Sequence, residues 1–103
     1  MTYITSVVYE KGVKFDMDYY LATHMPLVQK LWGPYGLKSW KVVHYTSPDA
    51  PYAVQAWLEW ESKEGADKGF PSSDGAIIFA DVSKFSDKPA MSMTGEMTGS
   101  ASW

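Results

Sequence analysis

The order in which strand-like and helix-like segments follow one another constrains this chain more than any other feature. Four segments are rich in β-branched, aromatic or alternating apolar residues, as is typical of strands: 2–10, 38–46, 52–61 and 89–97. Residues 16–32 repeat their apolar side chains with the period of an amphipathic helix. The stretch 62–87 is less regular and favours a second, broken helical region. The order is therefore strand, helix, strand, strand, helix, strand.

This order predicts an α+β fold of the ferredoxin-like kind, with one antiparallel sheet and both helices on one face. In the first strand, both alternating faces carry apolar groups, for example Val7 on one face and Val8 on the other. A lone subunit would leave the second face uncovered. We therefore expect a homodimer in which the sheet of a second subunit covers it, giving a dimeric α+β barrel.

The length of 103 residues suits one domain. We assign residues 1–97 to this domain and residues 98–103 to a short C-terminal tail, whose Gly, Ser and Thr residues offer little to bury.

Punctuating residues mark where the helices begin and end. Asp16 is a suitable N-cap for the helix 16–32, and Gly33 followed by proline ends it. Pro26 lies on the outer side of this helix, so we expect a bend rather than a break there. The sequence PSSDG is predicted to interrupt the second helical region.

Composition excludes several classes of function. The net charge is −3, and all nine basic residues are scattered lysines without a single arginine, which argues against nucleic acids and polyanionic ligands. There is no cysteine, hence no disulfide and no thiolate metal site. No run approaches the ~18 apolar residues needed to span a bilayer, and no basic segment precedes an apolar one at the N-terminus. We expect a cytoplasmic protein that does not interact with membranes.

His24 is the main candidate for chemistry because it lies in the middle of the apolar face of helix 16–32. It is either a core histidine held by one hydrogen bond or an imidazole that faces a pocket as a general acid/base. Tyr20, one turn earlier, would be its polar companion. His44 is interpreted as a structural or interface residue, and Asp81 as a helix cap or turn former.

We expect a pocket beside His24 to be apolar. Aromatic residues make up 16% of the chain, and one small core cannot easily enclose them all, so some of them must line a cavity or an interface. Leu27, Val28 and Leu31 share the face of His24, and Trp60 comes from the third strand. We predict that these four residues bind a hydrophobic substrate. No phosphate loop, dinucleotide motif or metal-ligand spacing is present, so we predict no bound cofactor and no metal.

The segment FDMDYYLATHMPLV (15–28) resembles the signature of the EthD family, named after bacterial ethyl tert-butyl ether degradation. Eight residues fit that signature: Phe15, Asp16, Tyr19, Tyr20, His24, Pro26, Leu27 and Val28. The later stretch IIFADVSKFSDKPAMSMTGEM (77–97) is similar to the second half of the family. The resemblance therefore covers nearly the whole chain up to the tail.

The resemblance implies a ferredoxin-like dimeric α+β barrel and a place in a catabolic or biosynthetic pathway. It implies a small enzyme or enzyme accessory for a hydrophobic or aromatic metabolite, an oxidoreductase or a lyase or isomerase if it is an enzyme. A non-catalytic carrier of a hydrophobic small molecule is the first alternative. A haem-binding protein with His24 as axial ligand is the second.

Overall fold

The computed structural model describes residues 2–12 and 14–103 and contains, in that part of the chain, one four-stranded antiparallel sheet. Its strands are β1 (Tyr3–Glu10), β2 (Leu37–His44), β3 (Tyr52–Trp60) and β4 (Met91–Glu96). Their order across the sheet is β2-β3-β1-β4, so the first and third strands are central. This is the ferredoxin-like order, and the fold class predicted from the sequence is confirmed.

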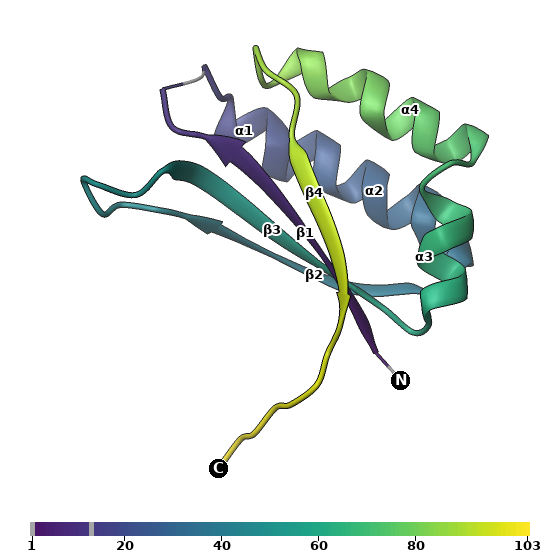
Figure 1. The fold of residues 1–103 in the computed structure, drawn as a ribbon. Helices are drawn as coiled ribbons and strands as arrows, with labels where there is room; N and C mark the ends of the chain where they lie inside the picture. Colours follow the sequence, from purple (N-terminus) through teal and green to yellow (C-terminus); the bar gives the residue numbers. More distant parts are fainter. Residues whose placement is uncertain (1, 13) are drawn as a thin grey trace.

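Two helical regions connect these strands, one between β1 and β2 and one between β3 and β4. Their α-helices are α1 (Met17–Tyr19), α2 (Met25–Trp32), α3 (Lys63–Gly69) and α4 (Ser73–Asp81). Figure 1 shows the helices together on one side of the sheet, with α2 and α4 next to each other. The other side of the sheet carries no helix in the described part of the chain.

The strand register decides which side chains face the helices. Val7 lies opposite Ala56 and Tyr9 opposite Val54 on the two central strands. Tyr9, Val54 and Ala56 are buried under the helices, whereas Met93 lies opposite Ser6 on the other face and is exposed. The alternation predicted for the first strand is thus confirmed.

The first helical region runs from Met17 to Trp32 without interruption but is not α-helical throughout. The carboxylate of Asp16 accepts a hydrogen bond from the Tyr19 amide at 3.1 Å, as expected for an N-cap. A π-helical turn then follows at Tyr20–His24, in which the Met25 amide donates to the carbonyl five residues earlier. Pro26 lies in the first turn of α2, directly after this wider turn. The helix was predicted from the sequence, but the π-helical turn was not.

The second helical region divides into two short helices, each with a serine cap. The hydroxyls of Ser62 and Ser72 each accept a hydrogen bond from the backbone amide three residues later, at 3.2 and 3.0 Å. The predicted interruption at PSSDG is therefore found, but it is shorter than that motif, because only residues 70–72 separate α3 from α4 and the last three residues of PSSDG form the first turn of α4. A Cβ atom at Gly75 would lie 2.2 Å from the carbonyl oxygen of Phe70, so this tight junction requires glycine.

One end of the layer between helices and sheet is filled by three aromatic residues, Trp32, Trp60 and Phe70, which we call the Trp cluster. The ring centroid of Trp32 lies 5.4 Å from that of Trp60 and 4.8 Å from that of Phe70. The indole of Trp60 donates to the Thr5 hydroxyl at 3.0 Å, and that of Trp32 donates to the Gly69 carbonyl at 2.9 Å. Both indole N–H groups are thus satisfied, as in an ordinary core.

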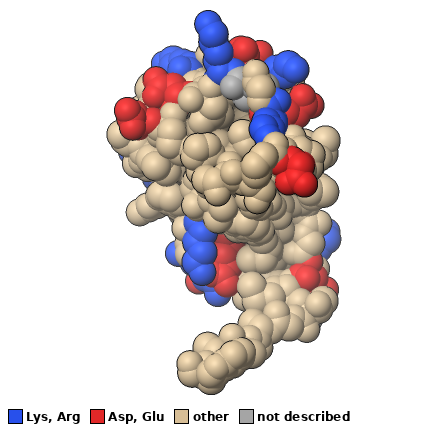
Figure 2. All heavy atoms as spheres, turned by 90° about the vertical axis from the view of Figure 1, so that its left-hand side faces the viewer, with Lys and Arg blue, Asp and Glu red and all other residues tan. Residues whose placement is uncertain are grey.

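The face of the sheet without helices and the C-terminal tail account for much of the exposed apolar surface. Met91 and Met93 of β4 are exposed on that face. Beyond Met97, whose amide bonds to the Thr2 carbonyl at 3.0 Å, the chain forms no helix or strand and leaves the sheet, as Figure 1 shows. In Figure 2, seen from the side of the β2–β3 turn, uncharged atoms cover much of the surface and the whole projecting tail. No helix in the described residues is long and apolar enough to cross a membrane.

Candidate functional site

A cavity of about 380 Å³ lies between the helices and the sheet. Its walls come from β1, β3, the π-helical turn, α2 and α4, with further residues from the segment 86–90 before β4. Most of the lining side chains are aliphatic or aromatic. The exposed residues Asp87, Lys88 and Pro89 also border it, so the cavity opens to solvent on their side. Its volume falls within the range of about 300–1,000 Å³ that is usual for small-molecule sites.

A buried histidine–aspartate pair lies against this cavity. His24 ends the π-helical turn, and Asp81 is the last residue of α4, so the two helical regions bring them together. The Nδ1 atom of His24 lies 3.0 Å from an Asp81 carboxylate oxygen, and the two residues are only 4% and 8% exposed. Because a carboxylate can only accept, the hydrogen must be on Nδ1.

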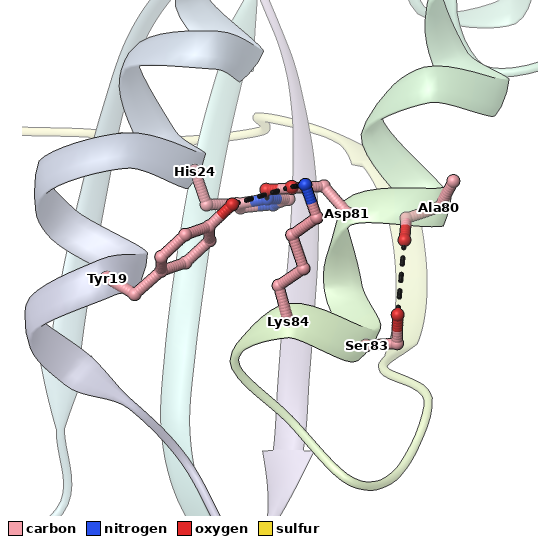
Figure 3. A network of polar contacts seen from close by, with 6 residues as sticks. All are labelled: Tyr19, His24, Ala80, Asp81, Ser83 and Lys84. Atoms are coloured by element: carbon pink, nitrogen blue, oxygen red, sulfur yellow. Dashed lines mark hydrogen bonds and ion pairs between the residues drawn. The ribbon is translucent and has the colours of Figure 1, made fainter.

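Tyr19 completes this cluster from the same helical region. Its hydroxyl donates to the other carboxylate oxygen of Asp81 at 2.8 Å. The ammonium group of Lys84 lies 3.7 Å from that same oxygen. Figure 3 shows the phenol of Tyr19 and the imidazole of His24 both directed at Asp81, which comes from the facing helix. Asp81 therefore fixes the position of His24 and its tautomer.

The protonation states follow from burial and these hydrogen bonds. Burial lowers the pKa of His24, and the hydrogen bond and negative charge of Asp81 only partly offset this effect. Burial raises the pKa of Asp81, but the hydrogen bonds from His24 and Tyr19 outweigh it and leave the pKa below its usual value. At neutral pH the pair is therefore a neutral imidazole beside a carboxylate.

The second ring nitrogen of His24, Nε2, is available for chemistry. No described residue forms a hydrogen bond to it, and no buried side-chain nitrogen or oxygen in the described part of the chain lacks a partner. Nε2 must therefore reach open space, and the cavity is the space that His24 lines. A neutral imidazole with its hydrogen on Nδ1 presents a lone pair there, which is the arrangement of a general base.

Tyr20 lies beside His24 as predicted, and both residues line the cavity. Their rings stack with centroids 5.5 Å apart and planes 14° apart. Phe85 packs against both rings, with centroids at 4.9 Å from Tyr20 and 4.5 Å from His24. Tyr20 and His24 are the first and last residues of the π-helical turn and lie four positions apart, a spacing at which side chains on a helix are neighbours.

The four predicted substrate-binding residues do not all lie at the cavity. Val28 lines it. Leu27 and Leu31 are half-buried and are not part of the lining, and Trp60 is wholly buried in the Trp cluster. His44 is exposed at the end of β2, away from the cavity lining.

Sequence reasoning missed two members of the site. Asp81 was interpreted as a cap or turn former, and this is wrong, because its carboxylate is buried and pairs with His24. The spacing of Asp81 from Ile78 was the available signal, since residues three apart share one face of a helix and Ile78 is buried. Tyr19 was not assigned to the same helix face as His24, because the 3.6-residue period does not hold across a π-helical turn.

No group of three or more His, Cys, Asp or Glu residues in the described part of the chain is arranged to hold a metal ion. The reactive groups of the site are an imidazole, a carboxylate and phenols.

The sheet order, the helices on one face and the site between them define a class: small ferredoxin-like α+β proteins related in fold to dimeric α+β barrels. Within that class, this chain is similar to an EthD-like protein from Ralstonia eutropha JMP134, with a TM-score of 0.81 and 22% identity over 98% of this chain and 96% of that one. It is also similar to an ethyl tert-butyl ether degradation (EthD) family protein from Bacillus halodurans C-125, with a TM-score of 0.75 and 25% identity over 95% of this chain and 100% of that one.

A dimeric ferredoxin-like protein of unknown function from Thermobifida fusca YX shares the fold more distantly, with a TM-score of 0.62 and 11% identity over 94% of this chain and 92% of that one. No protein-family model matches the chain, and a search of curated proteins finds no significant match. The predicted resemblance to the EthD family is thus confirmed by the comparison of structures.

Proposed function

We propose that this protein is a small EthD-like enzyme that acts on a hydrophobic or aromatic metabolite by acid/base chemistry. His24 is the general acid/base, Tyr20 its polar companion, and Val28 part of the apolar wall. Asp81 and Tyr19 are positioning residues, because they act through His24. A cytoplasmic location stays a prediction from the sequence.

The observation that carries this proposal is the buried His24–Asp81 pair at the wall of an apolar cavity. A polar pair in such a place costs folding free energy unless it is fully hydrogen-bonded. Here the two carboxylate oxygens of Asp81 accept hydrogen bonds from Tyr19 and His24, while Nε2 of His24 is left for a ligand. The arrangement resembles the part of a hydrolase triad in which an aspartate orients a histidine as base, without the nucleophile.

Binding of an apolar probe tests the cavity. Naphthalene should raise the melting temperature of the protein, because a ligand that binds only the folded state stabilises it. The substitution Val28→Phe should remove this effect by filling the cavity. Leu27→Phe introduces the same ring one residue away, outside the cavity lining, and should leave the rise in melting temperature unchanged. An equal response of both variants, or no response in the wild type, would contradict the proposal.

Native mass spectrometry of freshly purified protein separates an enzyme from a carrier. If His24 performs chemistry, His24→Gln should retain a bound metabolite that the wild type converts and releases. If the protein is a carrier for which His24 is only a hydrogen-bond partner, the wild type should hold the metabolite and the variant should lose it. A Soret band in the purified wild type would instead favour the haem alternative.

We also infer that the protein is a homodimer joined through the sheet face without helices. Met93 and Met91 are exposed there, and the similar protein from Thermobifida fusca is described as dimeric. Light scattering should give about twice the mass of one chain. Met93→Lys should yield monomers, while Ile77→Lys should not, although the side chains are comparably exposed at 56% and 52% and Ile77 lies on α4. A monomeric wild type would refute this inference.

A further inference from the structure

Two tyrosine hydroxyls at the cavity are not used by the fold. Tyr9 comes from β1 and Tyr20 from the π-helical turn, and both residues line the cavity. They are 2% and 1% exposed. Their rings meet edge to face with centroids 5.8 Å apart, and Tyr20 stacks on His24. Two phenols and one imidazole thus form a continuous group along one wall.

Neither hydroxyl is held by the described part of the chain. Among the described residues, none forms a hydrogen bond with the hydroxyl of Tyr9 or Tyr20, in contrast to Tyr19, Tyr35 and Tyr45, whose hydroxyls donate to side chains. Yet no fully buried side-chain oxygen in that part of the chain lacks a partner. Among these residues the two hydroxyls are therefore not fully enclosed, and the cavity is the space that both residues line.

These hydroxyls are available as donors over the whole physiological pH range. Burial raises the pKa of Tyr9 and of Tyr20, and the proximity of the two phenols raises that of Tyr20 further. Both residues therefore remain protonated phenols. A buried O–H group without a partner on the protein is matched by an acceptor on the ligand.

We propose that the cavity binds the carbonyl oxygen of an apolar ketone through Tyr9 and Tyr20 and that His24 transfers a proton at the carbon next to it. This inference rests on the proposed acid/base function and names its substrate class. The acceptor is a single oxygen on an otherwise apolar body, because most of the lining is aliphatic or aromatic, with Val7 and Val28 as examples, and its other polar residues all come from the segment 83–92.

The step is balanced without an oxidant or reductant. The Nε2 lone pair of His24 takes a proton from the α-carbon, and the C–H electron pair becomes a C=C bond. The π pair of the carbonyl moves to the oxygen, where the two tyrosine hydroxyls stabilise the enolate. Return of the proton from Nε2 to the same carbon restores the ketone, and its return to a conjugated carbon gives an isomer.

Binding of two matched probes tests the oxygen site. The anion of 4-nitrophenol mimics an enolate oxygen on a planar ring and is seen by its visible absorbance, whereas 4-nitrotoluene has the same shape without the oxygen. The wild type should prefer the phenolate. Tyr9→Phe and Tyr20→Phe should each weaken phenolate binding by roughly tenfold or more, as expected for a hydrogen bond to a charged group, and leave 4-nitrotoluene unchanged.

Proton transfer is tested by deuterium exchange at the α-carbon of 2-tetralone in heavy water, followed by NMR. The wild type should accelerate exchange, His24→Gln should abolish the acceleration, and Tyr9→Phe should reduce it by about 100-fold. Tyr35→Phe is the matched control, because it removes a hydroxyl that donates to Asp74 outside the cavity lining, and it should exchange like the wild type. Melting curves establish that each variant is folded.

The outcomes separate this inference from the proposed function. If 4-nitrotoluene binds but the phenolate is not preferred, or if Tyr9→Phe and Tyr20→Phe exchange 2-tetralone as fast as the wild type, the ketone inference is overturned and the apolar site remains. Phenolate binding without any exchange in the wild type also overturns it. If neither probe binds, the proposed small-molecule function fails as well.

Discussion

The Trp cluster and the group formed by Tyr9, Tyr20, His24 and Phe85, which we call the His cluster, lie at opposite ends of the central strands. Trp60 is paired with the first residue of β1, and Val54, near the other end of β3, is paired with Tyr9. Both clusters are dense in rings with centroids about as close, 4.8 Å in one and 4.5 Å in the other. They differ in their polar atoms, since the indoles are bonded within the protein, whereas no described residue bonds to the two phenols of the His cluster.

This difference distinguishes a packed core from the reactive part of the site, although Trp32 and Phe70 also line the cavity. Aromatic density alone predicts neither, because both clusters would look the same in a list of buried rings. What matters is whether each polar atom is satisfied by the protein or left for something else. The comparison can be tested by removing one contact at a time from each cluster.

The largest effect on stability is expected from the Trp cluster. Trp60→Ala removes a wholly buried ring and its indole hydrogen bond to the Thr5 hydroxyl. The free energy of unfolding should fall by about 3–5 kcal/mol, measured by urea denaturation. The exposed Trp103→Ala serves as control and should cause no change. A loss near zero at Trp60 would mean that this end is not the core.

A smaller loss is expected when the carboxylate behind His24 is removed. Asp81→Ala leaves the Nδ1 hydrogen of His24 and the Tyr19 hydroxyl without their acceptor. Stability should fall by about 1–3 kcal/mol. Proton exchange should fall too, because the tautomer of His24 is no longer fixed. Asp67→Ala, which removes an exposed carboxylate paired with Lys63, should change neither quantity. An unchanged Asp81→Ala protein would show that the pair is not structural.

The pH dependence of stability gives a finer distinction. The pKa of His24 is lowered on folding, so the unfolded chain binds more protons between that lowered value and the ordinary value near 6.5. Stability should therefore rise with pH through that range and be constant above about pH 7.5. Burial raises the pKa of Asp81, but the hydrogen bonds from His24 and Tyr19 leave it below its usual value, so this carboxylate titrates below His24. His24→Gln should flatten the profile, and His44→Gln, which changes an exposed residue, should not.

The smallest effect is expected from the tail, which contributes to neither cluster. Ending the chain after Met97 keeps the bond from its amide to Thr2 and removes only exposed residues. The melting temperature should fall by less than the 4–8 °C that corresponds to about 1 kcal/mol in a domain of this size. A larger fall, measured by differential scanning calorimetry, would show that the tail packs against a second subunit.

The fold was predictable because strand alternation and helix periodicity are local properties that survive packing. The faces of β1 and β3, the cap at Asp16 and the strand order all followed from such patterns. The break at PSSDG was predicted in the right place but not its short length, because the serine cap and the close approach at Gly75 depend on backbone geometry that composition does not show.

Of the reactive residues of the site, only His24 and Tyr20 could be predicted from the sequence. His24 and Tyr20 lie on one apolar face, which a helical wheel shows. Asp81 is separated from His24 by 57 positions, and only the packing of α4 beside α2 brings the two together. The strand pattern shows that Trp60 faces the helices, but it does not show that the space around Trp60 is filled by other side chains. For this reason Trp60 was predicted to bind substrate.

The π-helical turn at Tyr20–His24 makes the helix longer by one residue than an α-helical path between the same ends. Deleting one residue there would restore the α-helical register and leave the segments on either side of the turn on their present faces. The contacts of Tyr19, Val28 and Trp32 would be preserved, while the side chains within the turn, Tyr20 and His24 among them, would be displaced. A single insertion or deletion in this turn can therefore change the reactive side chains during evolution while the fold stays the same.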